Sequence, residues 1–121
     1  MKSMLTVTKY ITLANYWDVV SKRIFAYYQR DRNVKYEYTT IIQSELGNKI
    51  LDRITIDDLE QWRTNLRKNG FSNGMIASST GILRKIFHEA KKDRLIDVNP
   101  MNELKGYPTV HRPLFQLTDE Q

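Results

Sequence analysis

Ile54-Thr55-Ile56-Asp57-Asp58-Leu59 opens a segment that runs to Asn99-Pro100 and contains two helices with explicit boundary signals. Thr55 stands where an N-cap belongs, and two carboxylates follow in the first turn, where they interact favourably with the helix dipole. Ile54 and Leu59 have the spacing of a hydrophobic staple across this cap. We therefore expect a helix over residues 56–68.

The same signals recur one helix later. Ser72 can cap a helix, and Phe71 and Ile76 again have the staple spacing. Between the two helices, Arg67 and Lys68 suit a helix C-terminus, and Gly70 suits the left-handed position that follows it. These signals predict a helix over residues 73–92.

Apolar periodicity indicates two more helices upstream. The first starts near Thr12 and ends at the turn around residues 30–33, and the second runs from about Lys35 to a stop at Gly47-Asn48. The positions expected to be buried in these two helices are Leu13, Tyr16, Trp17, Val20, Ile24, Tyr27, Tyr28, Tyr38, Ile41, Ile42 and Leu46. Those expected in the later two are Ile56, Leu59, Trp62, Leu66, Ile76, Leu83, Ile86, Phe87 and Ala90.

The chain is therefore expected to be all-α, a bundle of four main helices with short loops. Residues 1–11 are interpreted as a flexible lead-in, residues 12–98 as the helical domain, and residues 99–121 as a linker. Leu95-Ile96 is expected to fold back onto the core, and Asn99-Pro100 to form a turn. The only strand signal is the short Lys49-Ile50-Leu51.

Composition narrows the class of protein. A chain of 121 residues has the length of a single domain. Its composition, with 40% hydrophobic and 27% charged residues, is ordinary for a globular protein. The absence of cysteine excludes disulfides and thiolate metal sites and favours a cytoplasmic location. No apolar run approaches the length of a membrane span, so no membrane association is expected.

The positive charge is unevenly distributed. The net charge is +5, and residues 63–94 contain eight basic residues against two acidic ones, whereas residues 52–60 are net acidic. A basic side opposite an acidic side is typical of nucleic-acid-binding proteins.

The outward side of the predicted fourth helix is made of small and basic residues. A helical wheel places Gly74, Ser78, Gly81 and Lys85 on its outermost line. A glycine inside a helix costs about 1 kcal/mol relative to alanine. Close approach of another surface, such as DNA, would offset this cost, although tolerated surface glycines explain the pattern equally well. The second helix presents hydroxyl and amide groups outward, which suit bases, phosphates or plain solvent.

No pattern of catalytic residues is present. His88 and His111 are far apart and lack the spacing of metal ligands, and there is no glycine-rich phosphate loop and no nucleophile–base arrangement. We therefore expect no catalytic residue, no metal, no cofactor and no small-molecule substrate.

Two ordered sets of residues resemble a known family. One is Ile54-Thr55-x-x-Asp58-Leu59-x-x-Trp62-x-x-x-Leu66-x-x-x-Gly70-Phe71-Ser72, and the other is Leu83-x-x-Ile86-Phe87-x-x-Ala90-x-x-x-x-Leu95-Ile96-x-x-Asn99-Pro100. Both are similar to the core-binding domain of phage-type integrases, the tyrosine recombinases. Thr12-Leu13-x-x-Tyr16-Trp17 fits the opening of that domain, and Leu117-Thr118-Asp119-Glu120 looks like the start of the catalytic domain that follows it.

The resemblance implies a SAM-like helical bundle that clamps double-stranded DNA at a recombination site, while catalysis resides in a separate C-terminal domain. It also implies other integrase protomers as partners. The residues it places at the DNA are Lys35, Tyr36, Thr40, Gln43, Asn73, Ser78, Arg84 and Lys85. Ala77, Ser78 and Gly81 stand where relatives often carry longer polar side chains, which favours phosphate contacts over base reading. The alternative is a helical protein-interaction module of the SAM-like or death-like type.

Overall fold

The computed structural model of the chain describes residues 10–28 and 34–105. The turn at 30–33, most of the lead-in, His111 and residues 106–121 lie outside the described residues. The elements are α2 (Leu13–Tyr28), α3 (Val34–Tyr36), η1 (Glu37–Ile42), α4 (Gln43–Leu46), η2 (Leu51–Arg53), α5 (Ile56–Lys68), α6 (Asn73–Lys92) and η3 (Pro100–Asn102).

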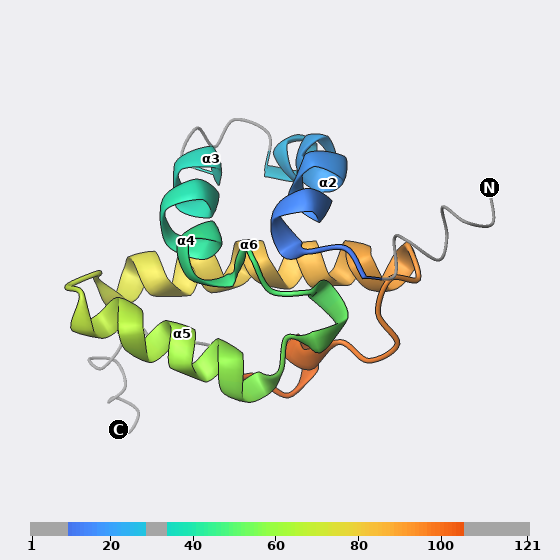
Figure 1. The fold of residues 1–121 in the computed structure, drawn as a ribbon. Coiled ribbons are helices and arrows are strands. Elements are labelled where there is room, and N and C mark those ends of the chain that lie inside the picture. The colour runs from blue at the N-terminus through green and yellow to red at the C-terminus, as the bar shows by residue number, and fades with distance from the viewer. Residues whose placement is uncertain (1–9, 29–33, 106–121) are drawn as a thin grey trace, which may run out of the picture.

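The all-α prediction is confirmed. Within the described ranges the only strand-like pairing is an isolated antiparallel bridge between Thr12 and Ile50. The long helix α6 runs along the domain, with α2 and the α3–α4 column on one side of it and α5 alongside (Figure 1). The core therefore lies where the shorter helices meet α6.

Both predicted N-caps are present. The Thr55 hydroxyl accepts a hydrogen bond from the Asp58 amide at 3.1 Å, and the Asp58 carboxylate accepts one from the Thr55 amide at 3.0 Å, which completes a capping box. The Ser72 hydroxyl accepts from the Met75 amide at 3.1 Å. These bonds start α5 and α6 at the predicted residues.

Both of these helices end in a Schellman motif. At the end of α5, Gly70 takes the expected left-handed conformation with φ of 91°, and the amide of Phe71 donates to the carbonyl of Leu66. At the end of α6 the left-handed residue is Arg94, with φ of 63°, and the amide of Leu95 donates to the carbonyl of Ala90. This second motif turns the chain back, and so the predicted return of Leu95-Ile96 to the core is confirmed.

The second predicted helix is one helical segment over residues 34–46, and its middle part, η1, is a π-helix. The hydroxyl of Thr39 donates to the Lys35 carbonyl at 2.8 Å, and the hydroxyl of Ser44 donates to the Thr40 carbonyl at 3.0 Å. Such side-chain bonds compete with the regular backbone ladder, which favours a local change of helix type. The segment ends at Leu46, as predicted, although Gly47 itself has a right-handed φ of −61°.

Aromatic residues connect the helices of the core. The Trp62 indole N–H donates to the carbonyl of Ile41 at 2.9 Å, and the ring of Trp17 stacks on Tyr38 at a centroid distance of 3.9 Å. Both tryptophans are buried, as predicted. Three expectations are wrong. Tyr27 is 60% exposed because it lies at the edge of the buried stripe of α2, and Tyr28 and Ile56 are only half-buried.

The predicted boundary between domain and linker at residue 99 is also wrong. The side chain of Asn99 caps η3 by accepting a hydrogen bond from the Met101 amide at 2.9 Å. Met101 and Leu104 are then buried in the core, at 0% and 4% exposure. The packed domain therefore extends at least to Leu104.

Candidate nucleic-acid interface

The predicted interface joins residues 34–46 to α6, where Asn73 and Ser78 lie in the N-terminal half and Arg84 and Lys85 lie just past the middle. Ser78 on α6 donates a hydrogen bond to the carboxylate of Glu37 at the start of η1, with distances of 2.9 and 3.2 Å to the two oxygens. On the outer side of residues 34–46 the predicted contacts Lys35, Tyr36, Thr40 and Gln43 are all exposed. The structure thus places the two predicted elements against each other, and the first four residues are accessible.

A buried carboxylate lies under this surface. Glu37 is only 4% exposed and also accepts a hydrogen bond from the buried hydroxyl of Ser79 at 3.1 Å. In the described part of the chain no lysine or arginine forms an ion pair with it. The hydroxyl of Ser78 is therefore already used within the protein, so its one proton is not available to a phosphate.

Asn73 is half-buried at the first position of α6, next to helix amides that have no partner inside a helix. Arg84 is also half-buried, and its guanidinium donates to the carbonyls of Met101 at 2.9 Å and Leu104 at 3.5 Å. Arg84 therefore holds the segment after α6 in place. These two bonds leave other donors of the guanidinium unused, so the contact of Arg84 with DNA stays a prediction.

Lys85 belongs to a charged network between α2 and α6. Its ammonium lies 3.2 Å from the carboxylate of Glu89, which is nearly buried and also contacts Arg23 at 2.7 Å and Lys92 at 3.7 Å. The guanidinium of Arg23 also lies 2.7 Å from the carboxylate of Asp93. Lys85 is thus neutralised locally, unlike the outward lysine expected from the helical wheel.

The network changes the proton affinities of its members. Burial alone would raise the pKa of Glu89, but hydrogen bonds from Lys85 and Arg23 outweigh it and hold that pKa below its ordinary value. The hydrogen bond from Arg23 also lowers the pKa of Asp93, against the opposing effect of burial. Burial raises the pKa of Tyr16, whose hydroxyl donates to Asp93 at 2.6 Å.

A notch lies between the end of α2 and the middle of α6. Its volume is about 330 Å³, and it is lined by Tyr27, Tyr28, Gly81, Arg84, Lys85 and His88. The ammonium of Lys85 stands 4.2 Å from the centroid of the Tyr27 ring, and Tyr27 and Tyr28 meet edge to face at 5.0 Å. The notch therefore combines aromatic rings with cationic groups.

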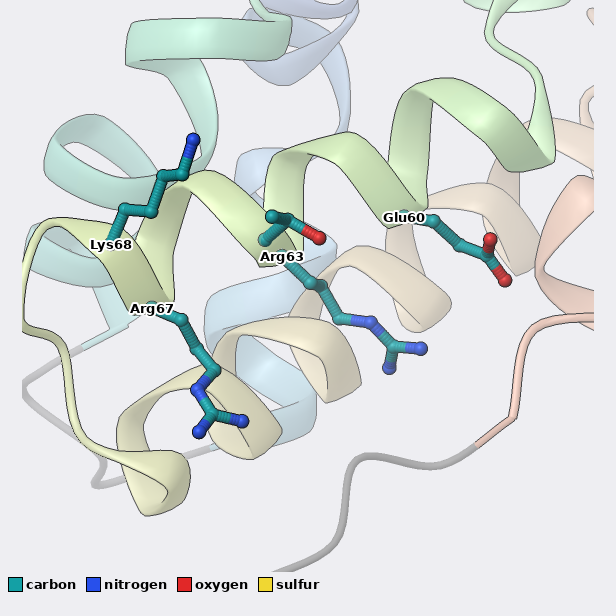
Figure 2. Close-up of a pocket in the computed structure, with 5 residues that line it drawn as sticks. Glu60, Arg63, Arg67 and Lys68 are labelled. Carbon is teal, nitrogen blue, oxygen red and sulfur yellow. The ribbon is translucent and has the colours of Figure 1, made fainter.

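A second basic surface lies on α5. A hollow of about 490 Å³ is lined by Glu60, Arg63, Thr64, Arg67 and Lys68, which recur along the helix at three- and four-residue spacing. Figure 2 shows Arg63 and Arg67 extending to one side and Lys68 to the other. Arg63 donates to the carbonyl of Lys105 at 2.9 Å. Seven of the eight basic residues counted over 63–94 thus lie on α5 or α6, and Arg94 follows the end of α6.

Sequence reasoning missed Glu37 and the aromatic part of the notch. Glu37 lies three residues after Val34 and four before Ile41, so helical spacing itself puts it on the buried side. Tyr27 and Tyr28 follow Ile24 by three and four residues, and periodicity alone does not show that the first of them leaves the core.

Among the described residues, none of the helices combines the length and the apolar character needed to cross a bilayer. The same part of the chain holds no cluster of three or more His, Asp or Glu side chains that could bind a metal. Comparison of the chain with protein-family models, with curated proteins and with solved structures found no match.

Proposed function

We propose that this chain is a non-catalytic module that binds double-stranded DNA, of the kind that its sequence resemblance to the SAM-like core-binding domain of tyrosine recombinases implies. The surface we assign to the duplex consists of the outer side of residues 34–46 and the N-terminal half of α6. The proposal includes the parent function suggested by the resemblance, site-specific recombination, with other copies of the protein as partners.

The observation that carries the proposal is Gly81 in the interior of α6. A Cβ atom built there would meet only the hydroxyl of Tyr28, at 3.9 Å, which is ordinary van der Waals contact. Nothing within the described structure therefore requires glycine, although it costs the helix about 1 kcal/mol relative to alanine. An external surface that approaches the backbone of α6 closely supplies a reason.

The charges support binding through phosphates. The chain is net positive by +5, and Lys35 is an exposed cation with no carboxylate partner among the described residues. The N-terminus of α6 adds amides and the positive end of a helix dipole. Such contacts hold a duplex in register but carry little sequence information.

Titration of a short fluorescent duplex at several salt concentrations tests the proposal. Each phosphate contact contributes about −0.9 to the slope of log affinity against log salt, so about four contacts give a slope near −3.6. Lys35→Gln removes one cation from the assigned surface and is expected to flatten the slope by about 1, whatever the DNA sequence.

Lys68→Gln is the matched control. It removes one exposed lysine from the basic surface of α5 and leaves the assigned surface intact. If Lys68→Gln flattens the slope and Lys35→Gln does not, the duplex binds α5 and our assignment of the surface is wrong. If no duplex binding is found even at low salt, the protein-interaction module becomes the better proposal.

A further inference from the structure

The notch between α2 and α6 has features that are not needed for binding the outside of a duplex. Its volume of about 330 Å³ lies at the small end of the range for ligand pockets, about 300–1,000 Å³. Three of the six lining residues, Tyr27, Tyr28 and His88, carry rings. A phosphate alone has no need of such rings, whereas a base does.

The ring of Tyr27 is exposed and yet held in place. It is 60% exposed, the ammonium of Lys85 lies 4.2 Å from its centroid, and Tyr28 contacts it edge to face. Lys85 is fixed in turn by the nearly buried carboxylate of Glu89 at 3.2 Å. A ring that keeps its orientation while exposing its surface loses little entropy when a base stacks on it.

Arg84 supplies the charge. Its guanidinium is oriented by the carbonyls of Met101 and Leu104, which do not neutralise it, and none of the described carboxylates forms an ion pair with it. Two of the five N–H donors of an arginine satisfy these carbonyls, and three remain. Gly81, with no side chain, leaves space between this cation and the rings.

We propose that the notch binds one unstacked nucleotide of single-stranded nucleic acid, with its base against Tyr27 and its phosphate near Arg84. In a duplex both faces of each base are covered by neighbouring bases, so a base reaches an aromatic platform only after it has left the stack. Gly81 belongs to both proposed surfaces, but the ring of Tyr27 is used only by the unstacked base, so the two proposals are tested separately.

The test compares two probes of equal charge, an oligothymidylate and an abasic deoxyribose-phosphate chain of the same length, in fluorescence-anisotropy titrations at one salt concentration. Because stacking on an aromatic residue contributes about 1–3 kcal/mol per base, we expect the oligothymidylate to bind about 5- to 150-fold more tightly. Tyr27→Leu is expected to remove this preference, and Tyr27→Phe to keep it.

Two further variants make the result specific to the notch. Tyr10→Leu removes another exposed tyrosine, which precedes the N-terminus of α2 and whose ring centroid lies 5.9 Å from the guanidinium of Arg53. This variant is expected to keep the preference for oligothymidylate. Gly81→Ala puts a methyl group into the notch without a clash and is expected to weaken oligothymidylate binding while the fold remains intact.

The proposal is overturned if the wild-type protein binds both probes equally or binds neither. It is also overturned if Tyr27→Leu retains the preference, or if Tyr10→Leu loses as much of it. Failure here is distinguishable from failure of duplex binding, because Tyr27→Leu is expected to leave the duplex salt slope unchanged, whereas Lys35→Gln acts on the duplex alone.

Discussion

Replacing Gly81 by alanine is expected to stabilise the protein. Gly81 lies in the interior of α6, where alanine is favoured over glycine by about 0.8–1.0 kcal/mol. The added Cβ would lie 3.9 Å from the Tyr28 hydroxyl, so no steric cost offsets this gain. For a domain of about 60–100 residues, 1 kcal/mol corresponds to a rise in melting temperature of about 4–8 °C.

Thermal unfolding followed by circular dichroism measures this change, and Gly70→Ala provides the contrast. Gly70 also has open space around it, but its φ of 91° is strained for any other residue. Alanine at this position is expected to cost about 1–2 kcal/mol. An unchanged or lower melting temperature for Gly81→Ala would refute the reasoning, because it would mean that the glycine serves the fold itself.

Three further predictions concern the rest of the fold. Thr55→Ala and Ser72→Ala should each lower the free energy of unfolding by about 1 kcal/mol, seen as a lower urea midpoint, since each leaves a first-turn amide without its partner. Arg94→Gly should raise the free energy of unfolding by about 1 kcal/mol, and so the urea midpoint, because glycine adopts the left-handed conformation without strain. An unchanged midpoint would mean that the Schellman motif is absent in solution. The lowered pKa values of Glu89 and Asp93 stabilise the protein above their unfolded-state values of about 4, and this stability is lost as pH falls through the lower folded-state values. Urea unfolding from pH 7 to pH 3 should therefore show a falling midpoint, and Glu89→Gln should make that fall shallower; an equal fall in both proteins would contradict the assignment.

The helix boundaries could be predicted from the sequence because local residues decide them. The cap at Thr55 involves only a partner three residues away, and the turn at Gly70 needs only one glycine after a run of basic residues. The packing of Met101 could not be predicted in this way. Its position is secured by Arg84, seventeen residues earlier, through a contact that exists only once the chain has folded.

The sequence predicts which side chains of the candidate site are exposed but not which hydrogen bonds they form. Lys35 and Gln43 are exposed, as helical spacing predicts. The hydroxyl of Ser78, however, bonds to Glu37, which lies forty-one residues away in the sequence. A helical wheel shows which way a side chain points and contains no information about a buried carboxylate on another helix.

The contacts of Arg84 have a thermodynamic consequence for the segment that ends at Leu104. The carbonyls of Met101 and Leu104 hold the guanidinium in one orientation and leave three of its donors for other partners. An anion that binds those donors meets a side chain that is already ordered, so docking of the segment and binding of the anion favour each other. Linkage makes this effect reciprocal. The docked segment favours anion binding by the same free energy by which the bound anion favours docking of the segment.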